Sequence, residues 1–231
     1  MDYNRLAELL FPHINTTPEE MEARYPKREL SEGAKVTRMG PSPTGFMHLG
    51  NLYGALVDER LAHQSTGVFY LRIEDTERKR EVEGGVQMIN DALKSFGLPF
   101  DGRATTDGET GIYGPYRQSQ RAEIYQTFVK SLVQRGMAYP CFCTEEELAA
   151  AHEQQEKNKE NFGYYGKYAV WRDRPMEDIE AELAKGTPYV ARFRSEGSIA
   201  HKIRHEDLVQ GKMDVTENDQ AVVILKSDGL P

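Results

Sequence analysis

One stretch, residues 35–54, constrains the fold of this chain more than any other. It reads K-V-T-R-M-G-P-S-P-T-G-F-M-H-L-G-N-L-Y-G, and its first part, Val36 to Met39, is a short β-forming run. Prolines and glycines at positions 40–45 then interrupt regular structure, and apolar residues recur with helical spacing from Leu49 onward. The stretch therefore predicts a strand, a tight loop and the start of a helix.

The predicted helix start carries His48, Gly50 and Asn51. A helix start presents unpaired N–H groups and the positive end of the helix dipole, so it favours a bound phosphate. Gly50 lets a ligand approach the backbone closely, and the His48 imidazole can donate a hydrogen bond to a phosphoryl oxygen. The four residues H-L-G-N taken alone are explained equally well by a helix start that carries an incidental histidine.

The composition is that of a globular protein, with 231 residues of which 39% are hydrophobic and 29% charged. The net charge of −8 argues against general nucleic-acid binding and leaves room only for a local basic patch. Two cysteines, Cys141 and Cys143, do not make a disulfide framework, so a cytoplasmic location is expected. We expect no signal peptide, no membrane association and no obligate protein partner.

A second β-forming run, Val68 to Ile73, suits a buried parallel strand that follows the helix in a right-handed crossover. Ligands of such sheets bind beyond the carboxyl ends of the strands. Arg38, Gly40 and Ser42 follow one strand, and Glu74 follows the next at the same edge. Because Arg38 can fork onto a carboxylate and Glu74 can accept from an ammonium group, the edge could hold both ends of an amino acid.

Asp75 and Thr76 are better explained as N-caps of a helix that starts at Glu77. Residues 101–114 are rich in glycine and threonine and predict a long loop. Residues 153–161 contain no apolar side chain, so we expect that part of a polar helix to be exposed. Helices are predicted at residues 4–11, 18–25, 82–96, 122–134, 144–160 and 175–186.

The second half of the chain contains a capping box, in which Thr144 precedes Glu147 by three residues. Residues 188–194 alternate like a strand that places Arg192 and Arg194 on one face. Lys202 to Val209 and Lys212 to Val215 could pair as a hairpin across Gln210-Gly211. Ala221 to Lys226 predicts a further buried strand.

The string R-M-G-P-S-P-T-G-F-M-H-L-G-N resembles the signature of class I glutamyl-tRNA synthetases, in which H-L-G-N stands for the so-called HIGH motif. The strings R-I-E-D-T and G-P-Y-R-Q-S-Q-R match as well, with Gln120 where glutamate is usual and Asn51 in place of the last histidine. The resemblance covers about residues 35–231. It implies an α/β fold with a Rossmann-type parallel sheet (a HIGH-motif nucleotidyl transferase) and an inserted α+β acceptor-stem-binding subdomain.

The same resemblance implies four segments. Residues 1–33 would form an N-terminal helical extension, residues 34–135 the first half of the Rossmann catalytic domain, and residues 136–219 the acceptor-binding insertion. Residues 220–231 would return to the nucleotide-binding sheet as a strand. Because motifs that follow in the family are absent, we expect the chain to be an N-terminal fragment with negligible aminoacylation activity of its own.

The implied function is that of a glutamate–tRNA ligase, which activates L-glutamate with ATP and Mg²⁺ and transfers it to the 3′ end of tRNA-Glu. The implied catalytic residues are His48, Gly50 and Asn51. The implied glutamate-binding residues are Arg38, Gly40, Ser42 and Glu74. The candidate tRNA contacts, which ordinary surface charge explains equally well, are Arg117, Arg192, Arg194, Lys202 and Arg204.

Some members of the family carry zinc at the C-x-C pair that corresponds to Cys141 and Cys143. A structural zinc site needs four ligands, usually cysteine and histidine, but the chain has no third cysteine. The nearest histidine, His152, falls inside the polar helix. We therefore expect no zinc and no other metal site in the protein.

Three alternative functions stay open. The first is a glutamyl-queuosine-type paralogue that glutamylates a modified tRNA nucleoside, against which the missing zinc ligands and residues 1–33 count. The second is a glutaminyl-tRNA synthetase, against which Ser42 counts, because those enzymes tend to differ at this part of the loop. The third is a non-catalytic nucleotide- or tRNA-binding module.

Overall fold

The structure is a computed structural model that describes residues 1–207 and 209–231. Contacts divide the chain into two compact units. The first consists of Met1–Pro18, Tyr125–Gly229 and Pro231, and the second of Glu19–Ile124 and Leu230. The four segments inferred from the family resemblance stay a prediction, because a division by contacts does not test functional segments.

The second unit is built on a four-stranded sheet in the order β1-β2-β3-β4. β1 pairs with β2 and β2 with β3 in parallel, whereas β4 is antiparallel to β3. The predicted parallel pair and its connecting helix are therefore confirmed. The strands are β1 (Val36–Met39), β2 (Val68–Leu71), β3 (Gly102–Ala104) and β4 (Glu109–Thr110), and the helices are α2 (Pro18–Arg24), α3 (Leu49–Gln64), α4 (Gly85–Ser95) and two 3₁₀ turns, Arg78–Arg80 and Gln118–Arg121.

The prediction of a continuous loop over residues 101–114 was wrong, because β3 and β4 lie within it. The segment Gly102–Ala104 contains no β-branched or aromatic residue, so its own propensity is low. The strand forms because β2 offers a free edge: the Asp101 N–H donates to Phe69 O at 2.9 Å, and Tyr70 and Leu71 pair with Gly102 and Arg103.

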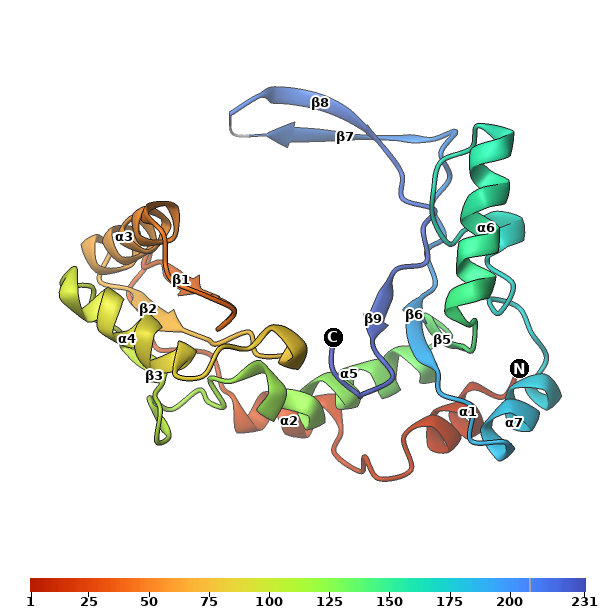
Figure 1. Cartoon of the computed structure of the whole chain (residues 1–231), viewed down its shortest axis with the longest axis horizontal. Helices are drawn as coiled ribbons and strands as arrows, with labels where there is room; N and C mark the ends of the chain where they lie inside the picture. Colours follow the sequence, from red (N-terminus) through yellow and green to blue (C-terminus); the bar gives the residue numbers. More distant parts are fainter. Residues whose placement is uncertain (208) are drawn as a thin grey trace. The chain divides into compact units, whose positions relative to one another are not determined.

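Helices α3 and α4 cover one face of this sheet (Figure 1). Phe69 and Leu71 of β2 are fully buried against Ala62 of α3 and Leu93 of α4. Since side chains alternate along a strand, Tyr70 and Arg72 point to the other face. The sheet thus has an apolar, helix-covered side and a side that carries charged residues.

The first unit holds a three-stranded antiparallel sheet in the order β5-β6-β9 and a two-stranded hairpin, β7-β8. The strands are β5 (Ala138–Cys141), β6 (Val190–Phe193), β7 (Lys202–Asp207), β8 (Gly211–Thr216) and β9 (Val223–Leu225). The helices are α1 (Tyr3–Leu10), α5 (Ala122–Gln134), which belongs to this unit from Tyr125, α6 (Glu145–Asn158), α7 (Met176–Ala184) and a 3₁₀ turn, Gly166–Tyr168. Across the described residues, no helix is long and apolar enough to cross a membrane.

Strand β9, in the segment predicted to return to the nucleotide-binding sheet, pairs within the first unit in this structure. It pairs with β6, with Leu225 opposite Ala191, and the Phe193 N–H donates to Val222 O at 2.9 Å. Leu225 is buried in the core of the first unit. An apolar run of this kind can be buried in any sheet with a free edge, and here that edge belongs to β6.

Helix α1 is part of the core of the first unit. Its buried residues Leu6, Ala7 and Leu10 pack with Val133 of α5 and Ile179 of α7. On α5 the apolar Phe128 is exposed, whereas the charged Lys130 is only 7% exposed. The Lys130 Nζ donates to Glu8 Oε2 at 2.9 Å, Phe11 O at 3.2 Å and Ile14 O at 2.7 Å, and so holds the segment that ends α1.

Helix α6 confirms the capping box: the Glu147 N–H donates to Thr144 Oγ1 at 3.2 Å, and the Thr144 N–H donates to Glu147 Oε2 at 2.9 Å. Its second half is mostly exposed, as predicted, except for Gln155, which is fully buried. The Gln155 amide donates to Gly163 O at 2.6 Å and accepts from the Gly163 N–H at 3.1 Å. The Gln155 side chain thus satisfies both the N–H and the C=O of Gly163, as a neighbouring strand would, and it holds the loop that follows α6.

The predicted hairpin is confirmed, with β7 and β8 paired from Lys202–Thr216 to Asp207–Gly211. Position 208, which falls inside the strand predicted from Lys202 to Val209, lies outside the described residues. Most of the hairpin is exposed, and Figure 1 shows it extending away from the three-stranded sheet of its unit.

An ionic cluster, of which only Glu59 is buried, joins α3 to the sheet of the second unit. His63 Nδ1 lies 2.9 Å from Glu59 Oε1, and His63 Nε2 lies 3.0 Å from Asp101 Oδ2. Asp101 also accepts from the Phe69 N–H at 2.8 Å. The hydrogen bond to Asp101, together with that to Glu59, raises the pKa of His63 above its ordinary value of 6.5, although burial acts in the opposite sense.

This raised pKa predicts a pH-dependent stability. Protonated His63 stabilises the fold in full below pH 6.5, the ordinary value, and the contribution is lost as the pH rises through the higher folded-state pKa. We expect the free energy of unfolding of the wild type to fall in that window relative to His63→Asn, as measured by urea unfolding at a series of pH values. A difference between the two proteins that stays constant with pH would contradict this assignment.

Candidate active site

His48 is the N-cap of α3, so the predicted change from loop to helix at this point is confirmed. The Gly50 N–H donates to His48 Nδ1 at 3.2 Å, and the His48 N–H donates to Asn51 Oδ1 at 3.2 Å. Because Nδ1 acts as an acceptor, the imidazole proton resides on Nε2, which is left as a donor. Asn51 therefore fixes the backbone of His48, and Gly50 fixes its tautomer.

A cleft of about 340 Å³ adjoins this helix start. His48 and Asn51 line it from α3, Ser42 and Gly45 from the preceding loop, and Ile89 from α4. His48 and Ser42 are both exposed. The cleft thus combines an imidazole N–H and a hydroxyl with the positive end of a helix dipole, which is an arrangement suited to phosphate oxygens.

Arg38 and Glu74 lie together at the ends of neighbouring strands, as the sequence predicts. Arg38 Nη1 donates to Glu74 Oε1 at 2.5 Å, and Arg72 Nη2 donates to the same oxygen at 3.1 Å. The Glu74 N–H donates to Pro41 O at 2.9 Å, which holds the carboxylate next to the loop after β1. The pair is about one third exposed, so a charged ligand can reach it.

Gly40 leaves the space in which this pair forms. A β-carbon at position 40 would lie 2.7 Å from Glu74 Oε1 and 2.9 Å from Arg38 Nη1. Both distances are shorter than side chains tolerate, so only glycine allows the two groups to meet in this position.

Arg72 is a site residue that sequence reasoning missed. In the sequence, Arg72 belongs to the β-forming run Val68 to Ile73, and we interpreted it only as part of that strand. The alternation of Arg72 with the buried Leu71 and Ile73 could have identified it, because this alternation places Arg72 on the same face of the sheet as Arg38.

The N-cap prediction for Asp75 was wrong. Asp75 Oδ1 accepts from the Ser119 N–H at 2.8 Å, and Oδ2 accepts from the Ser119 hydroxyl at 2.7 Å. The Asp75 carboxylate is buried. It joins the segment that follows β2 to the 3₁₀ turn before α5. The predicted helix from Glu77 is only a short 3₁₀ turn, and α4 begins at Gly85.

Three of the five basic residues proposed for tRNA contact are engaged inside the protein. Arg192 is only 8% exposed, donates to Ala221 O at 2.8 Å and lies 4.0 Å above the Tyr164 ring. Arg194 pairs with Asp173 at 2.6 Å, and Arg117 donates to Thr105 O at 2.9 Å. Burial removes Arg192 from the candidates for phosphate contact, because its guanidinium cannot reach a ligand without losing these contacts.

The other two basic residues lie on the exposed strand β7. Arg204 is 75% exposed and forks onto Asp214 at 3.0 and 3.3 Å, and Lys202 is exposed at the start of the strand.

Cys141 and Cys143 lie on either side of one tyrosine. The Tyr164 hydroxyl is 3.4 Å from Cys141 Sγ and 3.5 Å from Cys143 Sγ, and it accepts from the Trp171 N–H at 3.1 Å. The contact with Cys143, and to a smaller extent that with Tyr164, lowers the pKa of the Cys141 thiol despite burial. Among the described residues, no group of three or more His, Cys, Asp or Glu is arranged to hold a metal ion.

Two thiols and a phenol do not match the four nitrogen and sulfur ligands of a structural zinc site. His152 is not placed to complete such a set with them, since its ring packs 5.7 Å from that of Phe162. The absence of zinc stays a prediction. We expect elemental analysis of the protein, purified without chelator, to give far less than one zinc per chain, and a stoichiometric zinc content would contradict it.

Comparison with known proteins places these features in a family. The family described as tRNA synthetases class I (E and Q), catalytic domain, matches residues 35–231. A glutamate–tRNA ligase of Acetivibrio thermocellus is 53% identical over 232 residues, which are 100% of this chain and 42% of that protein. A glutamate–tRNA ligase of Clostridium perfringens strain 13 is 49% identical with the same coverage.

The crystal structure of a glutamate tRNA ligase from Elizabethkingia meningosepticum, in complex with its amino acid, has a TM-score of 0.72 and 35% identity. The match covers 87% of this chain and 40% of that one. The chain thus spans about 42% of the length of the curated relatives it matches. Together with the parallel sheet and the capped helix start, these similarities show that the chain belongs to the class I tRNA synthetases specific for glutamate and glutamine, of whose catalytic domain it is a part.

Proposed function

We propose that this chain supplies the amino-acid- and ATP-binding part of a glutamate–tRNA ligase that works in the cytoplasm. The observation that carries the proposal is the contact of 2.5 Å between Arg38 and Glu74 at the strand ends, in a chain 53% identical to a glutamate–tRNA ligase. Two neighbouring groups of opposite charge are complementary to a zwitterion. A bound amino acid replaces their mutual ion pair with two ion pairs of its own.

In the proposed reaction a carboxylate oxygen of glutamate attacks the α-phosphorus of ATP. An O–P bond forms, the bond to the β-phosphate oxygen breaks, and pyrophosphate leaves; the tRNA 3′ hydroxyl then attacks the acyl carbon, and AMP leaves. Glu74 holds the ammonium group and Arg38 a carboxylate, with Gly40 leaving the space for both. Ser42 lies in the adjoining cleft, where its hydroxyl is a further hydrogen-bonding group.

The start of α3 is the proposed site of the triphosphate. His48 donates from Nε2, and the start of the helix at Gly50 adds the positive end of the dipole. These groups are fixed before the reaction, so they stabilise charge that develops on the phosphate without reorganisation. Asn51 is better described as a positioning residue, since it bonds the His48 backbone. Mg²⁺ would arrive with ATP and neutralise part of the triphosphate charge.

Lys202 and Arg204 are the proposed phosphate contacts for tRNA, because both are exposed on β7. We expect Lys202→Gln and Arg204→Gln each to weaken tRNA binding and to reduce the slope of log K against log salt by about one. Arg174→Gln, at an exposed position in the segment before α7, is the matched control. Salt slopes equal to that of the wild type would contradict the assignment.

The experiment that tests the function is calorimetric titration with a non-hydrolysable glutamyl-adenylate analogue, with the glutaminyl analogue as comparator. We expect preferential binding of the glutamyl form, lost in Arg38→Ala and in Glu74→Ala. Arg80→Gln, an exposed arginine of the same unit paired with Glu77, should bind as the wild type does. Absence of binding by the folded chain, or preference for the glutaminyl form, would overturn the proposal.

A further inference from the structure

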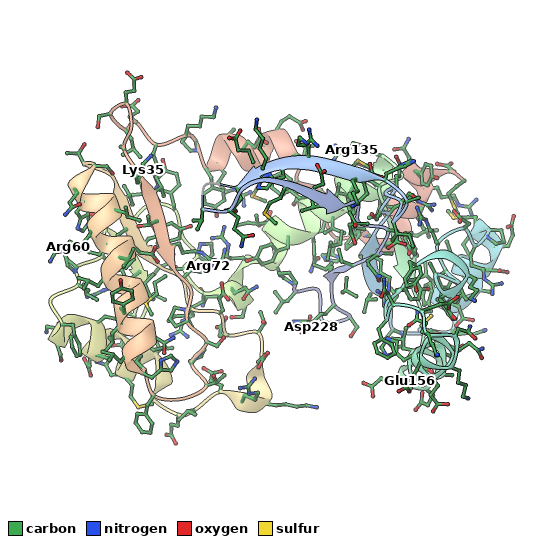
Figure 2. All side chains as sticks on the ribbon, turned by 90° about the horizontal axis from the view of Figure 1, so that it is seen from above. Lys35, Arg60, Arg72, Arg135, Glu156 and Asp228 are labelled. Carbon is green, nitrogen blue, oxygen red and sulfur yellow. The ribbon has the colours of Figure 1, made fainter. Side chains whose placement is uncertain are left out.

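A second cavity, of about 240 Å³, lies in the second unit on the face of the sheet that α3 and α4 leave uncovered. Three arginines line it, Arg28, Arg72 and Arg121, together with four tyrosines that include Tyr70 and Tyr113. Figure 2 shows Arg72 on the opposite side of β1 from α3. The cavity is therefore separate from the cleft at His48, which α3 and α4 line.

The charge of this cavity is unusual for the protein. The chain has a net charge of −8, yet no aspartate or glutamate is among the described residues that line the cavity. Among the lining arginines, Arg72 donates from Nη2 to Glu74, which is shared with Arg38, and Arg28 interacts electrostatically with Asp101. Glu109 also lies nearby, where it accepts from the Tyr116 N–H at 2.7 Å. Guanidinium groups that converge without matching carboxylates favour an oxyanion as the missing partner.

The hydrogen bonds of Arg72 and Arg121 also favour a bound anion. Arg121 Nη1 donates to Pro115 O at 2.7 Å, and Arg72 Nη2 donates to Glu74. In both residues, however, the Nε atom is buried and has no acceptor among the described residues. A buried donor of a charged group without an acceptor is costly. An anion in the cavity would face both guanidinium groups at once and offset their charge, although it would not reach the buried Nε atoms themselves.

Arg28 is held in advance of binding. Its guanidinium carbon lies 3.7 Å from the centre of the Tyr113 ring, so it stacks on that ring with its N–H edge available for an in-plane acceptor. Pre-organised arginines of this kind lose little side-chain entropy when an anion binds.

We propose that the cavity binds a compact oxyanion that carries at least two negative charges, of the phosphoryl or the dicarboxylate class. The three arginines that line the cavity are not among the groups assigned to substrate, so binding of the anion does not depend on the proposed function, and only its coupling to the Arg38–Glu74 pair rests on it. The bound anion and Glu74 share Arg72, so the anion draws Arg72 away from Glu74. Occupancy of the cavity is thereby coupled to the Arg38–Glu74 pair.

The test is calorimetric titration of the 231-residue chain at low ionic strength, with inorganic pyrophosphate in one arm and malonate in the other. We expect sub-millimolar binding of at least one anion, weakened about tenfold or more in Arg28→Gln and in Arg121→Gln. Arg80→Gln, which removes an equal charge from the surface of the same unit, should leave the affinity unchanged. Tighter binding of pyrophosphate assigns the phosphoryl class, and tighter binding of malonate assigns the dicarboxylate class.

His48→Ala separates the two anion sites. Binding that survives in His48→Ala and is lost in Arg121→Gln belongs to the cavity, whereas the reverse pattern places the anion at the helix start and overturns the proposal. Equal losses in Arg80→Gln and Arg28→Gln would also overturn it. The Nε–H resonances of Arg72 and Arg121 in the wild type give a readout that needs no variant, because they should shift on titration; resonances that stay in place at saturating anion would refute the site.

Discussion

Gly40→Ala should weaken binding of the glutamyl-adenylate analogue on the order of a hundredfold while changing the free energy of unfolding little. The added methyl group would lie 2.7 Å from Glu74 Oε1 and 2.9 Å from Arg38 Nη1. Both atoms are at the ends of flexible side chains, so they can move aside without disturbing the backbone. The fold therefore survives, but the two charged groups no longer stand where a zwitterion needs them.

Calorimetry measures the loss, and urea unfolding verifies that the variant is as stable as the wild type. Gly54→Ala is the matched control, since a β-carbon at that helical position would meet no atom within 4 Å. A double-mutant cycle sharpens the test, because Gly40→Ala should cost little more once Arg38→Gln has already removed one of the groups it displaces. Unchanged affinity in Gly40→Ala would show that the pair is not part of the binding site.

Lys130→Met should lower the free energy of unfolding by about 3 kcal/mol, the largest effect on stability that we expect from a single side chain. Lys130 is 7% exposed and donates to the carbonyl groups of Phe11 and Ile14. Methionine fills a similar volume but donates nothing, so Ile14 O loses this donor, and Phe11 O keeps only the Ile14 N–H at 3.2 Å. Glu8 contributes little to the loss, because it is 61% exposed and can return to water.

Urea unfolding of the two proteins with equal m-values measures this difference. Lys185→Met provides the control, since that lysine is 65% exposed and pairs with Glu182 on the surface of α7, where the change should cost less than about 0.5 kcal/mol. A loss in Lys130→Met no larger than in Lys185→Met would mean that the segment after α1 is held by apolar packing alone.

Features governed by neighbours in the sequence could be predicted without the structure. The strand Val36–Met39, the start of α3 at His48 and the capping box of Thr144 and Glu147 depend on chemistry within about four residues. The meeting of Arg38 and Glu74 was also within reach, because parallel strands joined by a crossover end at one edge. The assignment of both residues to glutamate, in contrast, came from the resemblance to a family.

Features that depend on partners far along the chain were decided only by the tertiary structure. Lys130 and Arg192 look like surface charges in the sequence, but carbonyl groups 116 and 29 residues away accept from them in the interior. Asp75 resembles a helix cap, yet its partner is Ser119, 44 residues later. Strand β9 has the sequence of a buried strand in either sheet, and the free edge of β6 determined which one it joined. The local sequence determines which kinds of partner a side chain can bond to, whereas the tertiary structure determines the actual partner. A polar group that is removed from water must form its hydrogen bonds with the donors or acceptors that packing places next to it.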